Sequence, residues 1–142
     1  MIAFQRAKVC CLMFLAVTFL AGTRIVMAHH SFAMYDMTKS VTLSGTVTSF
    51  EWTNPHAYIE MDVQEKDGKT KHWSVELGSP SILQQSGWKF KDIKPKDKVT
   101  VVLNQLKDGN AAGLLVQVTL PDGRVLGNGP GRGPTTPTAP AK

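Results

Sequence analysis

Cysteine is scarce in this sequence: two residues among 142, Cys10 and Cys11, stand side by side near the N-terminus. Both lie in an apolar run at residues 9–21, after a start that carries Arg6 and Lys8 and no acidic residue. If this segment is a leader that is removed, the mature chain has neither a disulfide nor a thiol site. No cysteine follows the apolar run directly, which argues against a lipid-anchored lipoprotein.

Long hydrophobic runs are also missing. The run at residues 9–21 falls short of the roughly 20 apolar residues of a transmembrane helix, and its basic start is typical of a secretory signal peptide. Val26 and Ala28 supply the small residues that signal peptidase prefers, which predicts cleavage between Ala28 and His29. We therefore interpret residues 1–28 as a signal peptide, with an uncleaved membrane anchor as the alternative. The mature protein is predicted to be periplasmic or secreted, without stable membrane insertion.

A strong excess of one charge is absent after cleavage. The whole chain has 16 basic and 11 acidic residues, a formal net charge of +5. The leader contains three of the basic residues and none of the acidic ones, so the mature chain carries +2. Nucleic-acid binding needs a concentrated basic face, and it is not expected here. One lysine cluster alternates with Asp92 and Asp97, as in a solvated loop: Lys89, Lys91, Lys94, Lys96 and Lys98.

Recognisable catalytic motifs are missing as well. The sequence has no serine nucleophile elbow, no glycine-rich phosphate loop after a strand, and no paired carboxylates at a loop. We therefore predict a protein that is not an enzyme. Oxidation at a copper site with an open coordination position is the one catalytic alternative.

What is present indicates one small domain and a tail. Residues 29–142 suffice for a single domain with a modest core. From residue 127 the sequence reads GNGPGRGPTTPTAPAK, without any large apolar residue. Such a segment cannot bury enough surface to offset the entropy lost on ordering. We predict a β domain at residues 29–126 and a flexible tail rich in glycine, proline and threonine at residues 127–142.

Apolar and polar residues alternate through most of the predicted domain, which is typical of strands. Ser79, Pro80 and Gly87 bracket a short predicted helix that ends near Gln85. Three strands, a short helix and two strands match a five-stranded OB-fold-like Greek-key barrel, an all-β fold with one short helix; an open sandwich is the alternative. The strands are predicted at residues 41–49, 58–63, 71–77, 98–106 and 114–120, with a short extended stretch at 124–126.

Four stretches of sequence together resemble a family of small exported bacterial proteins that is classed only as of unknown function (DUF6152-like). The resemblance implies export and a compact β domain, and it carries no activity, cofactor or site with it. It spans nearly all of residues 29–126. The stretches are HHSFAMYD, GTVTSFEWTNPHAYIEMDV, HWSVELGSPSILQQSGWKF and KPKDKVTVVLNQLKDGNAAGLLVQVTLPDGRVL.

The predicted mature N-terminus is a candidate copper site. A free amino-terminal His29 offers its α-amine and ring Nδ1 as a chelating pair, and a third nitrogen would complete a set suited to copper. His30 is adjacent in sequence and cannot easily supply that nitrogen, whereas His56 can if the fold brings it close. Met34 and Met37 add soft thioethers that suit Cu(I). The alternative is a mobile polar terminus whose histidines bind copper only adventitiously.

Cleavage one residue earlier would change the coordination geometry of the predicted site, but copper would still be the expected metal. A chain that begins at Ala28 has His30 in third position. The amine, two backbone amides and the imidazole then form a square that binds Cu(II).

The stretch Glu51-Trp52-Thr53-Asn54-Pro55-His56 predicts a loop beside the usual OB-fold binding face, because Asn-Pro favours a turn. Trp52, Asn54, His56 and Trp73 are the candidate ligand-binding residues. The structural alternative is a tryptophan that covers the barrel end, with His56 hydrogen-bonded to backbone.

Two further polar residues on the third predicted strand are expected to point outward. Alternation places His72 and Glu76 on the face opposite Trp73. We interpret His72 as an exposed residue, and Glu76 as a lone solvent-facing or capping carboxylate.

Together these patterns predict an exported binding module for a small ligand, a metal ion or another envelope protein, with copper as the sharper hypothesis. The alternative is an interaction or adaptor protein of the cell envelope that binds no metal.

Overall fold

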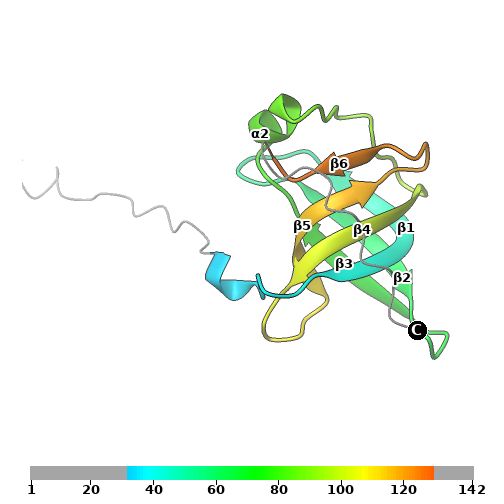
Figure 1. Cartoon of the computed structure of the whole chain (residues 1–142). Coiled ribbons are helices and arrows are strands. Elements are labelled where there is room, and N and C mark those ends of the chain that lie inside the picture. The colour runs from blue at the N-terminus through cyan, green and yellow to red at the C-terminus, as the bar shows by residue number, and fades with distance from the viewer. Residues whose placement is uncertain (1–31, 130–142) are drawn as a thin grey trace, which may run out of the picture. The chain divides into compact units, whose positions relative to one another are not determined.

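The computed structural model describes residues 32–129; residues 1–31, which include the predicted signal peptide, and residues 130–142 lie outside this range. Within it the elements run along the chain from a 3-10 turn through three strands, a helix and three more strands (Figure 1). They are η1 (Phe32–Met34), β1 (Val41–Glu51), β2 (Tyr58–Gln64), β3 (Thr70–Glu76), α2 (Pro80–Gln85), β4 (Lys98–Gln105), β5 (Ala112–Thr119) and β6 (Val125–Gly127).

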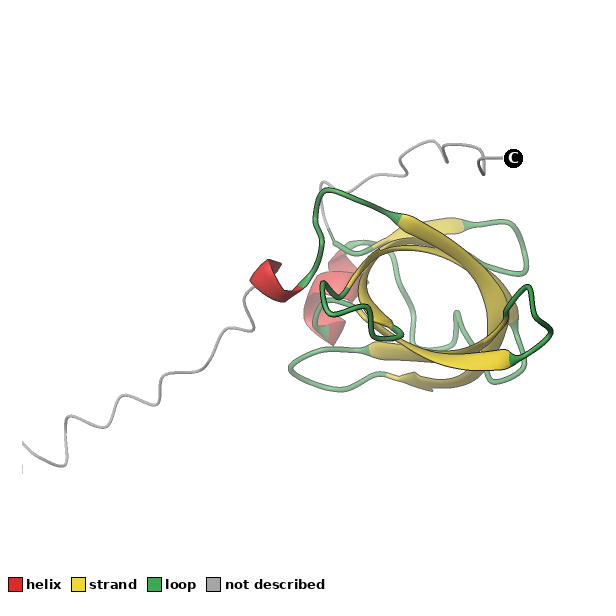
Figure 2. Cartoon of the chain, turned by 90° about the horizontal axis from the view of Figure 1, so that it is seen from below, coloured by secondary structure: helices red, strands yellow, loops and turns green. Residues whose placement is uncertain are grey.

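The strands form one sheet that closes into a barrel. Their order is β3-β2-β1-β4-β5-β6, and a parallel pairing of β3 with β5 joins Ser74 to Ala112 and Glu76 to Leu114. Figure 2 looks into the closed barrel. All other neighbouring strands are antiparallel. The predicted OB-fold-like barrel is confirmed, and closure excludes the open sandwich.

The alternation of apolar residues along the strands produces the core. On β3, Trp73 and Val75 are buried, whereas His72, Ser74 and Glu76, which alternate with them, are more exposed. Because successive side chains of a strand face opposite sides, one apolar set from each strand meets inside the barrel. The largest fully buried side chains are Ile59, Met61, Leu77, Leu83, Leu103, Leu115, Val47, Val75, Val101 and Val118.

The helix α2 follows β3, as predicted, and contributes the buried Leu83. Ser79 occupies the N-cap position, but its side chain makes no capping hydrogen bond; its hydroxyl lies 3.0 Å from the Ser81 hydroxyl instead. The sequence therefore predicted the start of the helix correctly, but the Ser79 side chain does not cap it. In the described range, the helices are all too short or too polar to cross a membrane.

Strand β1 pairs with both β2 and β4, and it approaches β2 closely at a glycine. A Cβ on Gly45 would lie 2.5 Å from the backbone oxygen of Asp62. A little further along the strand, the register with β2 shifts between Val47 and Ser49. Gly45 itself allows a close strand contact, and the bulge follows it.

The segment before β1 is tied to the end of β4. The Asp36 N–H donates to the Gln105 carbonyl at 2.8 Å, and Tyr35 forms an isolated bridge with Leu106. The buried Asn104 amide donates to the Lys39 carbonyl at 2.8 Å. The beginning of the described chain is thus held against one end of the barrel, beside η1 in Figure 1.

The sheet also extends past the predicted boundary at residue 126. Gly127 belongs to β6, and the Asn128 N–H donates to the Val116 carbonyl at 3.2 Å.

Candidate functional site

A carboxylate at the end of β3 brings together residues that are far apart in the sequence. Glu76 Oε1 lies 2.5 Å from His56 Nδ1. Glu76 Oε2 accepts a hydrogen bond from the Tyr35 hydroxyl at 2.8 Å and a longer one from the Tyr58 hydroxyl at 3.5 Å. We call Tyr35, His56, Tyr58 and Glu76 the Glu76 cluster. The prediction of a lone carboxylate was wrong, although the side chain does alternate outward.

Each partner reaches Glu76 from a different element. Tyr58 stands opposite Glu76 in the β2–β3 ladder. His56 precedes Ala57, whose N–H donates to the Gly78 carbonyl at 3.1 Å and whose carbonyl accepts from the Leu77 N–H at 2.8 Å. Tyr35 comes from the segment tied to β4. The loop between β1 and β2, the end of β3 and the N-terminal segment therefore converge on one carboxylate.

The two tyrosines remain proton donors over the physiological pH range. Burial, then the hydrogen bond to Glu76 and its negative charge, raise the pKa of Tyr35 well above its ordinary value. Burial and the charge of Glu76 also raise the pKa of Tyr58. Tyr35 itself is only 5% exposed. Its hydroxyl has little access to water, so the carboxylate is an essential hydrogen-bond acceptor for it.

His56 is held on one side only. Its Nδ1 is buried and lies close to Glu76 Oε1, although the contact does not have the angles of a regular hydrogen bond. A bare nitrogen lone pair this near a carboxylate oxygen would be repelled, so Nδ1 carries the ring proton. One third of the side chain remains exposed, at 33%. At Nδ1 the neighbour is therefore a carboxylate and not the backbone.

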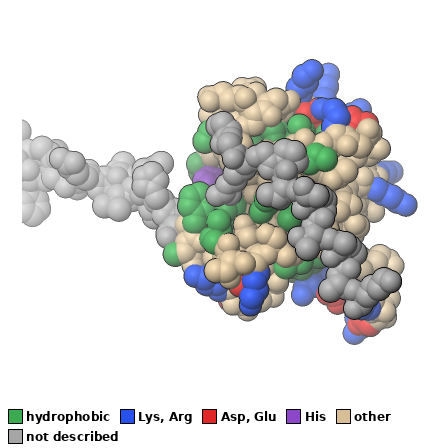
Figure 3. All heavy atoms as spheres, in the orientation of Figure 1, with side chains coloured by type: hydrophobic (Ala, Val, Ile, Leu, Met, Phe, Trp, Pro, Cys, Tyr) green, Lys and Arg blue, Asp and Glu red, His purple; other side chains and the backbone are tan. Residues whose placement is uncertain are grey.

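The exposed part of His56 lines a pocket of about 320 Å³. Its walls are mostly apolar and come from η1, the β1–β2 loop, the end of β3, α2 and β5. We call it the His56 pocket; it includes Phe32, Pro55, His56, Leu77, Ile82 and Leu114. Phe32 and Ile82 are also among the most exposed large apolar side chains of residues 32–129. Figure 3 shows hydrophobic side chains gathered where the described chain begins.

The structure does not bring all the predicted site residues together. Trp73 is only 6% exposed and belongs to the core. Trp52 is partly buried against the core and packs edge-on against Phe50, with ring centroids 5.5 Å apart. Asn54 is exposed and precedes a cis peptide bond to Pro55.

The predicted metal ligands divide into two groups. His29 and His30 lie outside the described residues. Met34 and Met37 are exposed on the N-terminal segment, and His56 lies at the pocket. Within residues 32–129, no three histidine, cysteine or acidic side chains are arranged to hold a metal ion. A metal at His56 would therefore need ligands from elsewhere.

A second polar cluster lies on the outer face of the β2–β3 hairpin. His72 Nδ1 is 2.8 Å from Asp62 Oδ1, and His72 Nε2 is 3.0 Å from Glu60 Oε2. The Ser74 hydroxyl donates to the other oxygen of Glu60 at 2.7 Å. Our interpretation of His72 as merely exposed missed these partners. Asp62 stands opposite His72 in the β2–β3 ladder.

This cluster predicts a pH-dependent contribution to stability. The hydrogen bond with Asp62, followed by that with Glu60, raises the pKa of His72 above its ordinary value of 6.5. A raised pKa in the folded state stabilises below the unfolded value and is lost as pH rises through the folded value. We expect His72→Gln to lower the free energy of unfolding at about pH 5.5, by less than about 1 kcal/mol because the pair is exposed.

The test is urea unfolding of the wild type and His72→Gln at about pH 5.5 and about pH 9, where the difference should vanish. Lys71→Gln on the same strand is the control. An equal difference at both pH values would contradict the assignment.

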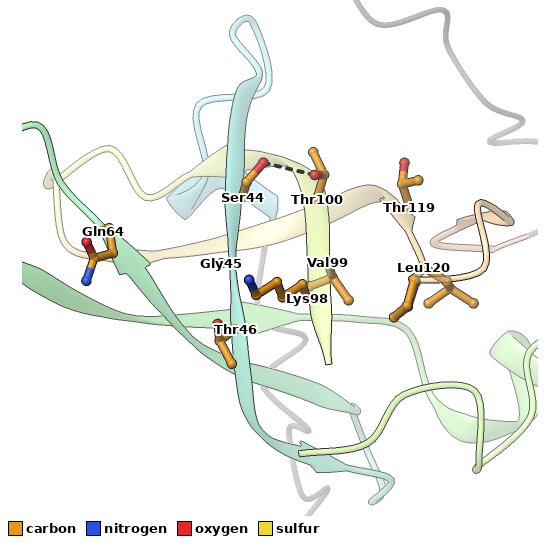
Figure 4. Close-up of a pocket in the computed structure, with 10 residues that line it drawn as sticks. Ser44, Gly45, Thr46, Gln64, Lys98, Val99, Thr100, Thr119 and Leu120 are labelled. Atoms are coloured by element: carbon orange, nitrogen blue, oxygen red, sulfur yellow. Dashed lines mark hydrogen bonds between the residues drawn. The ribbon is translucent and has the colours of Figure 1, made fainter. Parts of the chain in front are cut away.

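Another cavity among the described residues has a different character. It measures about 570 Å³ and lies over β1, β4 and the end of β5 (Figure 4). The hydroxyls of Ser44 and Thr100 are 2.9 Å apart in it, and the Lys98 side chain lies beside Gly45. Lys98 is the one charged side chain among its lining residues. This open hydroxyl-rich groove brings together none of the predicted site residues.

Fold and cluster together define an OB-fold-like barrel protein with a tyrosine- and histidine-bound carboxylate at one end. The chain belongs to a family of unknown function (DUF6152), whose model matches residues 18–117. This confirms the resemblance drawn from the sequence motifs. No curated protein matches the sequence.

Among solved structures, the chain is similar to Rim1, a mitochondrial single-stranded DNA-binding protein of S. cerevisiae. The two are 13% identical, with a TM-score of 0.43. The match covers 64% of this chain and 97% of that one.

Proposed function

We propose that this protein is an exported, periplasmic binding module that holds one copper ion at the end of the barrel, with His29 and His56 as the principal ligands. The observation that carries the proposal is the contact between His56 Nδ1 and Glu76. Metal-binding histidines usually turn their other ring nitrogen to a carboxylate, which fixes the ring and raises its basicity. His56 has that arrangement, and its Nε2 is the nitrogen left for a metal.

The position of the N-terminal segment supports the same site. His29 precedes Phe32 by three residues, and Phe32 lines the His56 pocket. Three residues of extended chain span about 10 Å, so an N-terminus at His29 has the reach to meet His56. The Tyr35–Glu76 hydrogen bond anchors this segment to the same carboxylate that holds the imidazole.

The donor set favours copper. An amino-terminal His29 contributes its amine and Nδ1, and His56 contributes Nε2, which makes three nitrogen ligands. Nitrogen sites bind Cu(II) more tightly than other divalent first-row metals. Met34 and Met37 lie on the same exposed segment, where a thioether would favour Cu(I). His30 is the third-position ligand if the chain begins at Ala28.

A second candidate function is an envelope interaction or adaptor module without metal. It is favoured by the exposed apolar side chains of Phe32 and Ile82, which border the same pocket.

The test is an intact-mass measurement and a copper titration of untagged protein from the periplasm. We expect a mass that begins at His29 and one copper ion per chain. His56→Ala and a variant with an extra alanine before His29 should each weaken copper binding on the order of 100-fold or more, because each removes a ligand. His72→Ala is the matched control and should bind copper like the wild type.

Copper binding that is indifferent to both His56→Ala and the added alanine would overturn the metal proposal. The interaction module would then be the better hypothesis. A mature mass that begins at Ala28, with tight copper lost in His30→Ala, would move the site to the N-terminus alone.

A further inference from the structure

The His56 pocket contains polar groups that the copper proposal does not use. Asn128 lines it, and its Oδ1 accepts a hydrogen bond from the Gly78 N–H at 2.6 Å. This contact fixes the orientation of the side-chain amide, so Nδ2 remains as a donor. The pocket therefore combines apolar walls with an amide donor and the imidazole edge of His56.

The pocket is preformed because its walls belong to connected elements. The Trp88 indole N–H donates to the Gly127 carbonyl at 2.8 Å, which holds the end of β6 against the segment after α2. The backbone of Asn128 is bonded to β5. Leu77 is fully buried, and Leu114 is 2% exposed. A ligand would meet rigid walls on these sides, which lowers the entropic cost of binding.

The size of the pocket limits the ligand to a small molecule. An apolar cavity of about 150 Å³ accepts a benzene molecule. The His56 pocket, at about 320 Å³, has room for one ring and a short substituent, and mostly apolar walls with a few polar groups are typical of small-molecule sites.

We propose that the His56 pocket binds a single-ring phenol in the metal-free protein. Its ring would lie among Phe32, Ile82 and Leu114, and its hydroxyl would donate to His56 Nε2 and accept from Asn128 Nδ2. With the ring proton on Nδ1, Nε2 is an acceptor, and a hydroxyl is the group that can accept from an amide and donate to an imidazole at once. A carboxylate cannot donate, and an ether cannot satisfy Nε2.

This inference goes beyond the copper proposal and does not depend on it. A copper ion on Nε2 would occupy the lone pair that the phenol needs as an acceptor, so this mode of binding requires that Nε2 be free of metal. Phenol binding is therefore measured without metal, and the copper titration is a separate experiment.

The experiment is a titration of the mature protein with 4-methylphenol in a buffer that contains a metal chelator. Binding is monitored by the NMR chemical shifts of leucine methyl groups. We expect saturable shifts at Leu77 and Leu114. The matched probe 4-methylanisole, which lacks the hydroxyl proton, should bind about tenfold more weakly, the effect of one hydrogen bond. His56→Gln should weaken 4-methylphenol binding at least as much, with His72→Gln as the control.

A filled pocket is the second test. Ile82 is 42% exposed, so Ile82→Trp can be accommodated at the surface while its indole enters the pocket. It should weaken 4-methylphenol binding at least tenfold, with the thermal unfolding midpoint measured to show that the variant is folded. Equal binding of 4-methylanisole, or binding unchanged in folded Ile82→Trp, would overturn the proposal. The copper proposal would be unaffected by either result.

Discussion

Glu76→Ala is expected to lower the free energy of unfolding by about 3 kcal/mol, because hydrogen bonds to a charged group contribute about 1.5–3 kcal/mol and a buried hydroxyl without a partner adds a further cost. The variant removes the acceptor of the Tyr35 hydroxyl and the anion beside His56 Nδ1. Both groups would remain largely buried without their partner. Urea unfolding at neutral pH measures the loss.

The control for this variant is Glu65→Ala. Glu65 is exposed and lies 3.9 Å from the Lys71 ammonium, and surface changes of this kind are usually within about 0.5 kcal/mol. Adding Tyr35→Phe to Glu76→Ala should recover part of the loss, because the hydroxyl that lacks a partner is gone. A Glu76→Ala variant as stable as Glu65→Ala would show that the cluster contributes nothing to the fold.

Loss of this cluster should also loosen the N-terminal segment. Tyr35 connects it to Glu76, while the backbone bonds of Asp36 connect it to β4. The copper proposal needs this segment in place, so Glu76→Ala should weaken copper binding although Glu76 is not a ligand. Glu76→Ala should still bind one copper ion per chain, with lower affinity. That result would indicate that Glu76 positions the ligands and does not bind the metal itself.

Gly45→Ala is expected to cost about 3 kcal/mol, at the upper end of the usual range for overpacking. The added Cβ would lie 2.5 Å from the Asp62 backbone oxygen and 2.6 Å from Met61 Cε. The methionine side chain can move aside, but the carbonyl belongs to the neighbouring strand and cannot move without disturbing the β1–β2 pairing. Denaturant unfolding of the purified variant gives the cost.

Gly68→Ala provides the matched comparison. Gly68 has a φ of +81° in an exposed turn, and nothing lies within 4 Å of the position that an added methyl group would take. Its cost should come from the left-handed backbone alone, about 1–2 kcal/mol. If Gly45→Ala were no more destabilising than Gly68→Ala, the close approach of β1 and β2 would not be a constraint on the fold.

The strands were predictable because their signal is local. Alternating residues placed Trp73 and Val75 inside, and each strand was found within about two residues. The short helix followed from Pro80 and Gly87. The missing cap of Ser79 was not predictable in this way, because Ser81 competes for the same hydroxyl.

The candidate site was predictable only in part. The loop composition singled out His56, but nothing local indicated that Tyr35 and Glu76 would meet beside it, 41 residues apart in the chain. The sequence left open whether Trp52 packs or binds a ligand, because a large aromatic ring serves packing and binding equally well. Strand alternation correctly placed the Glu76 side chain outside the barrel core. The error was to assume that a side chain outside the core contacts only solvent.

The sequence alone therefore determined the class of fold, because hydrophobic periodicity and turn residues are local signals that act over a few positions. The resulting order of strands and helix matches the OB-fold. Closure through the β3–β5 pairing and the convergence of Tyr35, His56 and Tyr58 on Glu76 arise from contacts between distant segments. Such contacts depend on the path of the whole chain, and no local pattern records them. For this reason His56 could be singled out from the sequence as a candidate, while the carboxylate and the pocket beside it became visible only in three dimensions.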